Sequence, residues 1–167
     1  AFDAEDSNTS VVHFPYRRMT EDDLFALFRP SGQSQGPKLR EAIRSLKLVE
    51  ALGGVSDTLA IYQGRLLPKQ RKSRATFYGH VSLYQDAVHN PHCNFDIRNL
   101  SEQLHAECIY STDRPPGDPA NFGVIDQQAL GYCEGLIARI QTLVHSAELA
   151  CLFQATGPSL SDVIDQF

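Results

Sequence analysis

The chain has 167 residues, 42% of them hydrophobic, and a formal net charge of −5. This size and composition predict one domain with a sizeable core, and no run of about 18 apolar residues is present to span a bilayer. The polar, acidic start of the sequence is unlike a signal or transit peptide, so we expect a soluble protein without a membrane partner.

The first part of the chain predicts an arm followed by two helices. Residues 1–19 show no sustained periodicity and are interpreted as an N-terminal arm. Thr20 is a typical N-cap residue, and the three acidic residues after it suit the helix dipole of a first helix that ends at Pro30. A second helix is predicted from Pro37 to the pair Gly53–Gly54, because its apolar residues recur at steps of three and four.

The middle of the chain predicts two more helices. Residues 55–73 fit either a short helix or a strand inside a loop. A third helix is expected over about 74–89, where Asn90–Pro91 stops it. Asn94 can cap a fourth helix that continues to about Tyr110.

The last part combines the clearest loop with the longest helical pattern. Residues 111–123, rich in proline and glycine, predict a loop. Helical spacing then continues from Val124 to about Phe153, which predicts one long C-terminal helix of roughly 43 Å. We therefore expect an all-α fold: a helical bundle of four to five helices over residues 20–157, followed by a tail at 158–167.

The spacing of cysteine and histidine residues raises a zinc hypothesis. The four cysteines are too widely spread for a small disulfide scaffold, which predicts free, mostly buried thiols and favours a reducing compartment. Two pairs have a three-residue spacing suited to zinc, His89 with His92 and His105 with Cys108, although Pro91 interrupts the first pair. Buried cysteines with surface histidines explain the same pattern. We therefore expect no metal and no cofactor.

No complete catalytic motif is present. The residues His105-Ala106-Glu107 match the H-x-E half of the zinc deaminase motif, but its P-C-x-x-C half is missing. Serine hydrolase, metalloprotease, P-loop and dinucleotide motifs are also absent from the sequence. The sequence thus favours a protein that binds rather than an enzyme.

A basic stretch is the first candidate binding site. Residues 37–74 hold nine Lys and Arg against three acids (+6), whereas residues 75–167 hold three Arg against eleven acids (−8). Such cations can bind phosphates with release of counterions, and neighbouring aromatic rings can stack on bases. A solvated loop that keeps the protein soluble is an equal alternative. The stretch contains Arg65, Lys69, Arg71, Lys72 and Arg74, and Phe77 and Tyr78 follow it.

Residues 95–99, Phe-Asp-Ile-Arg-Asn, carry a resemblance to a known family. They match the Phe-Asp-x-Arg-Asn pattern of tobamovirus coat proteins, and residues 91–97 are similar to the corresponding stretch of the barley stripe mosaic virus group, the hordeiviruses. The predicted order of elements over residues 20–157 also resembles coat proteins of rod-shaped plant RNA viruses. The chain departs from the pattern at Leu100, where the family has a second arginine. It also lacks an arginine pair at 122–124, before the long helix.

The resemblance implies a capsid subunit that self-assembles helically around single-stranded RNA, in the virion or the host cytoplasm. Arg98 would contact an RNA phosphate and Asp96 would be part of the same site. The loop 111–121 would face a central channel, with Asp113 and Asp118 in a repulsive cluster between subunits. Two alternatives remain: a helical adaptor or effector domain that binds another protein through an apolar groove, and a small zinc-binding protein.

Overall fold

The computed structural model describes residues 16–53, 59 and 64–153. Within these ranges the protein forms seven α-helices and isolated β-bridges but no strand, which confirms the predicted all-α helical bundle. The predicted tail at 158–167, and most of the arm and of residues 55–63, lie outside the described residues. The helices are α1 Glu21–Phe28, α2 Gln35–Ala51, α3 Arg74–Leu83, α4 Gln85–Val88, α5 Leu100–Glu107, α6 Gln127–Val144 and α7 Ala150–Phe153, with 3-10 turns η1 Tyr16–Arg18, η2 Ile97–Asn99 and η3 Ala147–Leu149.

The start of α1 agrees with the sequence prediction. The Thr20 hydroxyl accepts a hydrogen bond from the Asp23 N–H, and the Thr20 N–H donates to the Asp23 carboxylate at 2.8 Å. This capping box satisfies two N–H groups at the helix end. The other end of α1 is held by α6, because Arg139 donates to the carbonyl oxygens of Phe28 and Arg29 at 2.8 and 3.0 Å.

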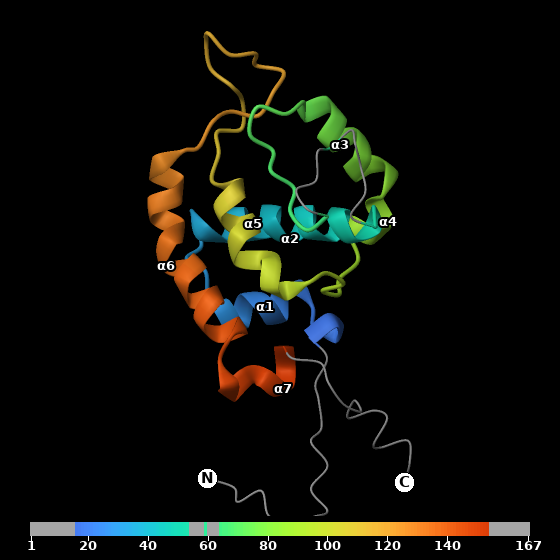
Figure 1. Cartoon of the computed structure of the whole chain (residues 1–167), viewed down its shortest axis with the longest axis vertical. Helices are drawn as coiled ribbons and strands as arrows, with labels where there is room; N and C mark the ends of the chain where they lie inside the picture. The colour runs from blue at the N-terminus through green and yellow to red at the C-terminus, as the bar shows by residue number, and fades with distance from the viewer. Residues whose placement is uncertain (1–15, 54–58, 60–63, 154–167) are drawn as a thin grey trace, which may run out of the picture.

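The core lies where α2, α5 and α6 meet. In Figure 1, α5 crosses α2 near the centre, α6 covers one side of both, and α3 and α4 lie at the opposite side. Buried leucine and isoleucine side chains of α2, α5 and α6 fill one large cluster, which includes Leu39, Ile43, Leu46, Leu100, Leu104, Leu136 and Ile140. A second cluster joins the C-terminal half of α2 to α3 and to the segments beside it, including Leu48, Leu67, Phe77, Ile109 and Phe122.

The predicted C-terminal helix over 124–153 is present but shorter than predicted. Helix α6 has 18 residues and ends at Val144, and residues 147–153 continue at an angle of 63° to it. The Ser146 hydroxyl accepts the Leu149 N–H and so starts the new turn. The apolar periodicity continues through the break because both pieces bury a face on the same core. Phe153 reaches Tyr16 there, with ring centroids 6.1 Å apart.

Other boundaries also differ from the sequence prediction. The third helix is split at Tyr84 into α3 and α4, and the fourth begins as a 3-10 turn at Ile97 and ends at Glu107. Tyr16, assigned to the arm, is buried and donates its hydroxyl hydrogen bond to the Phe95 carbonyl at 2.8 Å. Among the described residues, no single helix is long and apolar enough to cross a membrane. The bent pair of α6 and residues 147–153 meets that test by length and composition alone.

Candidate nucleic-acid interface

Two segments far apart in the sequence are joined by backbone hydrogen bonds at one end of the bundle. The Arg71 N–H donates to the Phe122 carbonyl at 3.1 Å, and the Phe122 N–H donates to the Lys72 carbonyl at 2.9 Å. On the other side, Gly123 donates to the Tyr110 carbonyl at 2.9 Å. We call residues 69–74 and 109–124 the basic end. It forms the upper part of the molecule in Figure 1.

Glycine is required where these segments approach most closely. A Cβ atom on Gly123 would lie 2.7 Å from the Thr112 carbonyl oxygen and 2.7 Å from the Tyr110 Cβ, well inside van der Waals contact. The absent side chain therefore allows the two ends of the loop 111–123, predicted from its prolines and glycines, to lie close together.

Three cationic side chains are exposed at the basic end. Arg71 and Lys72 come from the predicted basic segment, and Arg114 comes from the loop. The Arg114 guanidinium lies 4.4 Å from the centroid of the Tyr110 ring, a cation–π contact. Arg71 has a φ angle of 56°, a left-handed conformation that is uncommon for a residue with a side chain.

Lys69 is placed differently from the other cations of the segment. It is 5% exposed, and its Nζ lies 2.5 Å from the Glu107 Oε2 and 4.3 Å from the centroid of the Phe77 ring. The other Glu107 oxygen accepts hydrogen bonds from the Ser45 hydroxyl at 2.6 Å and from the Gln103 amide at 2.8 Å. The Lys69 ammonium therefore belongs to the core and is not presented to a phosphate, unlike the sequence expectation.

Arg74 and Arg65 complete the predicted segment. Arg74 begins α3 and is half-buried, and its Nε is buried without a hydrogen-bond partner among the described residues. Arg65 is exposed and precedes the basic end in the sequence.

Two aromatic side chains of α3 follow these cations in the sequence. Phe77 is buried, whereas Tyr78 is 46% exposed and its ring centroid lies 6.1 Å from that of Phe122.

A cavity of about 550 Å³ opens at the basic end. Arg71, Arg114 and Asp113 supply its charged groups, and Tyr110 and the two loop prolines, Pro115 and Pro116, supply apolar walls. This cavity could not be predicted from the sequence, because its walls come from both the basic segment and the loop.

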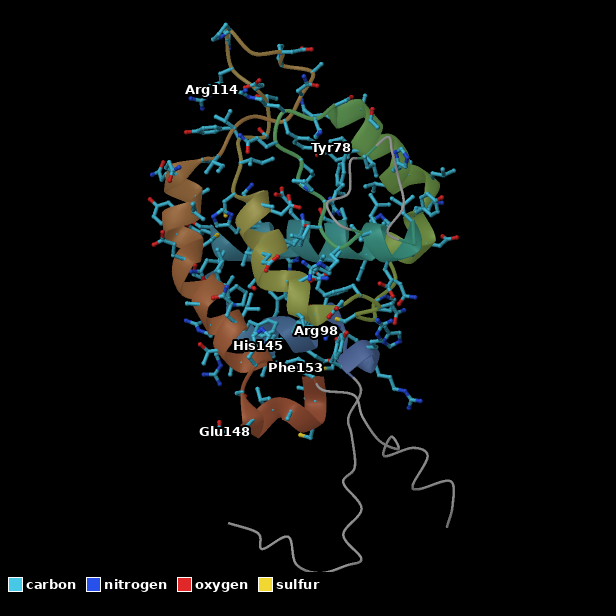
Figure 2. The ribbon with its side chains drawn as sticks, in the orientation of Figure 1. Tyr78, Arg98, Arg114, His145, Glu148 and Phe153 are labelled. Carbon is cyan, nitrogen blue, oxygen red and sulfur yellow. The ribbon has the colours of Figure 1, made fainter. Side chains whose placement is uncertain are left out.

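Arg98 and Asp96, which the resemblance at residues 95–99 predicts as RNA contacts, do not lie at the basic end. Figure 2 shows Arg98 far below Arg114, whereas Tyr78 lies toward the Arg114 end. The Arg98 Nε and Nη2 donate to the two Asp96 carboxylate oxygens at 2.9 and 2.8 Å, although Arg98 is 70% exposed. These hydrogen bonds hold the pKa of Asp96 below its ordinary value. Arg98 thus already has an anionic partner.

No family model matches this chain, nor does any curated protein or solved structure. We infer its function from its own residues.

The zinc candidates are not brought together. No group of three or more His, Cys, Asp or Glu side chains able to hold a metal ion occurs in the part of the chain that the structure describes. His89, His92 and His105 are exposed, whereas Cys108 is buried. Burial raises the pKa of the Cys108 thiol to about 12, so the thiolate form that binds zinc is disfavoured at neutral pH.

Sequence reasoning missed two residues of the interface and its support. The sequence places Arg114 in a polar loop, and only its position with Arg71 in the wall of the cavity indicates a binding role. In the sequence Glu107 belongs to half of a deaminase motif, whereas in the structure its fully buried carboxylate pairs with Lys69. Both pairs join residues that are distant in the sequence, and no local sequence pattern predicts them.

Proposed function

We propose that this protein binds single-stranded RNA at the basic end, through phosphate contacts from Arg71, Lys72 and Arg114, as a structural subunit of an RNA–protein assembly. The observation that carries the proposal is that Arg71 and Arg114, exposed cations from two segments, line one cavity, with the exposed Lys72 next to Arg71 in the chain. Arginine donates several N–H groups in a fixed plane that matches phosphate oxygens, and such contacts need no base sequence.

Two further features support RNA as the ligand. The exposed ring of Tyr78 lies against the Phe122 ring of the basic end and is available to stack on an unpaired base, which a duplex would not offer. The net charge of the whole chain is −5, so the remaining surface repels a polyanion and restricts binding to this end.

The coat-protein part of the proposal rests on the resemblance at residues 95–99 and on the helical bundle. In this chain Phe95, Ile97 and Asn99 are buried, and Asp96 caps η2 by accepting the Arg98 N–H at 3.1 Å. The motif therefore has a structural role in addition to any contact with RNA. A subunit of this kind would polymerise with copies of itself and occur in a virion or in the host cytoplasm.

Matched double variants test the phosphate contacts. Arg71→Gln/Arg114→Gln removes two arginines at the basic end, whereas Arg17→Gln/Arg40→Gln removes two arginines that form exposed ion pairs with Glu50 and Glu21. Affinity for a fluorescent 20-nucleotide RNA is measured by anisotropy at several salt concentrations. Each lost phosphate contact lowers the salt slope by about 0.7, so the first double variant should bind roughly 25-fold more weakly at 0.1 M salt.

Three results decide the proposal. The control double variant should keep the affinity and the salt slope of the unaltered protein within about threefold. Equal loss in both double variants, or no RNA binding at 50 mM salt, overturns RNA binding at the basic end.

Electron microscopy and size-exclusion chromatography test assembly: a protein that stays monomeric with RNA contradicts the coat-protein role. Arg98→Gln, measured in the same way, reports whether residues 95–99 also contact RNA.

A further inference from the structure

The cavity at the basic end contains a carboxylate that phosphate binding alone does not explain. Asp113 lines the same cavity as Arg71 and Arg114, yet none of the ion pairs in the described ranges involves Asp113. A carboxylate in a phosphate-binding cavity repels the ligand, unless the ligand also offers it a hydrogen-bond donor.

The loop holds the Asp113 carboxylate in a fixed position. Its Oδ1 accepts the Arg114 N–H at 3.1 Å, and the Asp113 N–H donates to the Asn121 carbonyl at 2.9 Å. Gly117 packs directly against the carboxylate, where a Cβ atom would overlap both oxygens and the Cγ. The loop thus holds a carboxylate at the wall of the cavity, and the Arg114 N–H uses only part of its acceptor capacity.

The remaining walls suit one nucleotide. The volume of about 550 Å³ lies within the range of roughly 300–1,000 Å³ typical of small-molecule sites. Pro115 and Pro116 provide apolar surface for a base or sugar, and the two guanidinium groups, of which Arg114 lies over the Tyr110 ring, provide phosphate donors.

We propose that this cavity holds one ribonucleotide, with Arg71 and Arg114 on its phosphate and the Asp113 carboxylate accepting a hydrogen bond from the ribose 2′-hydroxyl. The inference rests on the proposed function and adds a sugar preference to it. The 2′-hydroxyl is the group by which a protein distinguishes RNA from DNA, and a carboxylate is a strong acceptor for it. The site therefore selects RNA over DNA.

The test compares ligands that differ only at the 2′ position. Oligouridylate and oligodeoxyuridylate of ten nucleotides are competed against the fluorescent RNA at one salt concentration, and uridine and deoxyuridine monophosphates are titrated by NMR. One charge-assisted hydrogen bond corresponds to about a tenfold preference for the ribose form.

Two variants remove the preference by different routes. Asp113→Asn removes the charge but keeps the size and the acceptor for the Arg114 N–H. Gly117→Ala keeps the charge but displaces the carboxylate. Both should bring the ribose-to-deoxyribose ratio near one. The control is Asp118→Asn. Asp118 is on the same loop but does not line the cavity, and its Oδ1 accepts the Ala120 N–H at 2.9 Å.

The outcomes separate this inference from the proposed function. Equal binding of the two oligonucleotides by the unaltered protein overturns the sugar preference while RNA binding stands. Asp113→Asn that weakens both ligands equally shows that Asp113 acts only on the loop, which also overturns the preference. Selective binding of uridine monophosphate without oligonucleotide binding supports the cavity but contradicts the proposed function. Circular dichroism of each variant identifies any that has unfolded, and the comparison of ligands on the unaltered protein remains decisive.

Discussion

The buried ion pair of Lys69 and Glu107 gives the strongest stability prediction. Replacement of Lys69 by methionine keeps most of the side-chain volume but leaves the Glu107 Oε2 without its partner inside the core. Glu107 is fully buried, so the uncompensated charge should lower the free energy of unfolding by about 3–5 kcal/mol. The hydrogen bonds from Ser45 and Gln103 reach the other carboxylate oxygen and do not replace the ammonium.

A double-mutant cycle isolates the pair. Glu107→Gln alone leaves the Lys69 ammonium buried against the Phe77 and Phe122 rings, and we expect a loss of similar size. Lys69→Met with Glu107→Gln removes both charges and should be more stable than either single variant. Urea unfolding followed by circular dichroism at pH 7 gives the four free energies.

Two results would refute this reasoning. A loss below about 1 kcal/mol for Lys69→Met would place Lys69 outside the core, since exposed ion pairs contribute about 0–1 kcal/mol. Strict additivity of the two single variants would show that the charges do not interact. Arg17→Met is the surface control, because its ion pair with Glu50 is half exposed.

Three further predictions concern the thiols, Asp96 and the loop. Cys151 is the one exposed cysteine in the described part, so a thiol reagent should label it fast in the native protein, and fast labelling of a second cysteine would contradict the packing. Arg98→Gln should raise the Asp96 pKa, measured by NMR; the stability from this pair, present above pH 3.8, is lost as the pH falls through the lowered pKa. Gly123→Ala should lower the melting temperature by several degrees by pushing against Tyr110, and an unchanged value would contradict the close approach.

Local signals predicted the helices well. The Thr20 cap and the acidic residues after it placed α1 because capping is decided by neighbours in sequence. Helix α2 begins at Gln35, two residues before the predicted start, and Pro37 falls within its first turn, where a missing N–H is tolerated. The break after Val144 was missed because a change of direction that keeps the apolar face on the core leaves the helical periodicity intact.

The sequence predicted only one of the two segments that form the candidate site. Its basic segment was recognised by composition, which needs no knowledge of the fold. Its partner loop, the contribution of Arg114 and the burial of Lys69 depend on pairing between distant segments. That pairing is decided by backbone hydrogen bonds and by the fully buried Glu107, which periodicity does not reveal.

The backbone pairing between Lys72 and Phe122 also bears on the order in which parts of the protein fold. These residues are about fifty positions apart, so their hydrogen bonds close a long loop, and the entropy of closing it must be offset by other contacts. Helices α2, α5 and α6 supply those contacts and should assemble first. We therefore expect the amides of Arg71 and Phe122 to exchange with solvent deuterium faster than those of the core helices, as the last region to fold and the first to open.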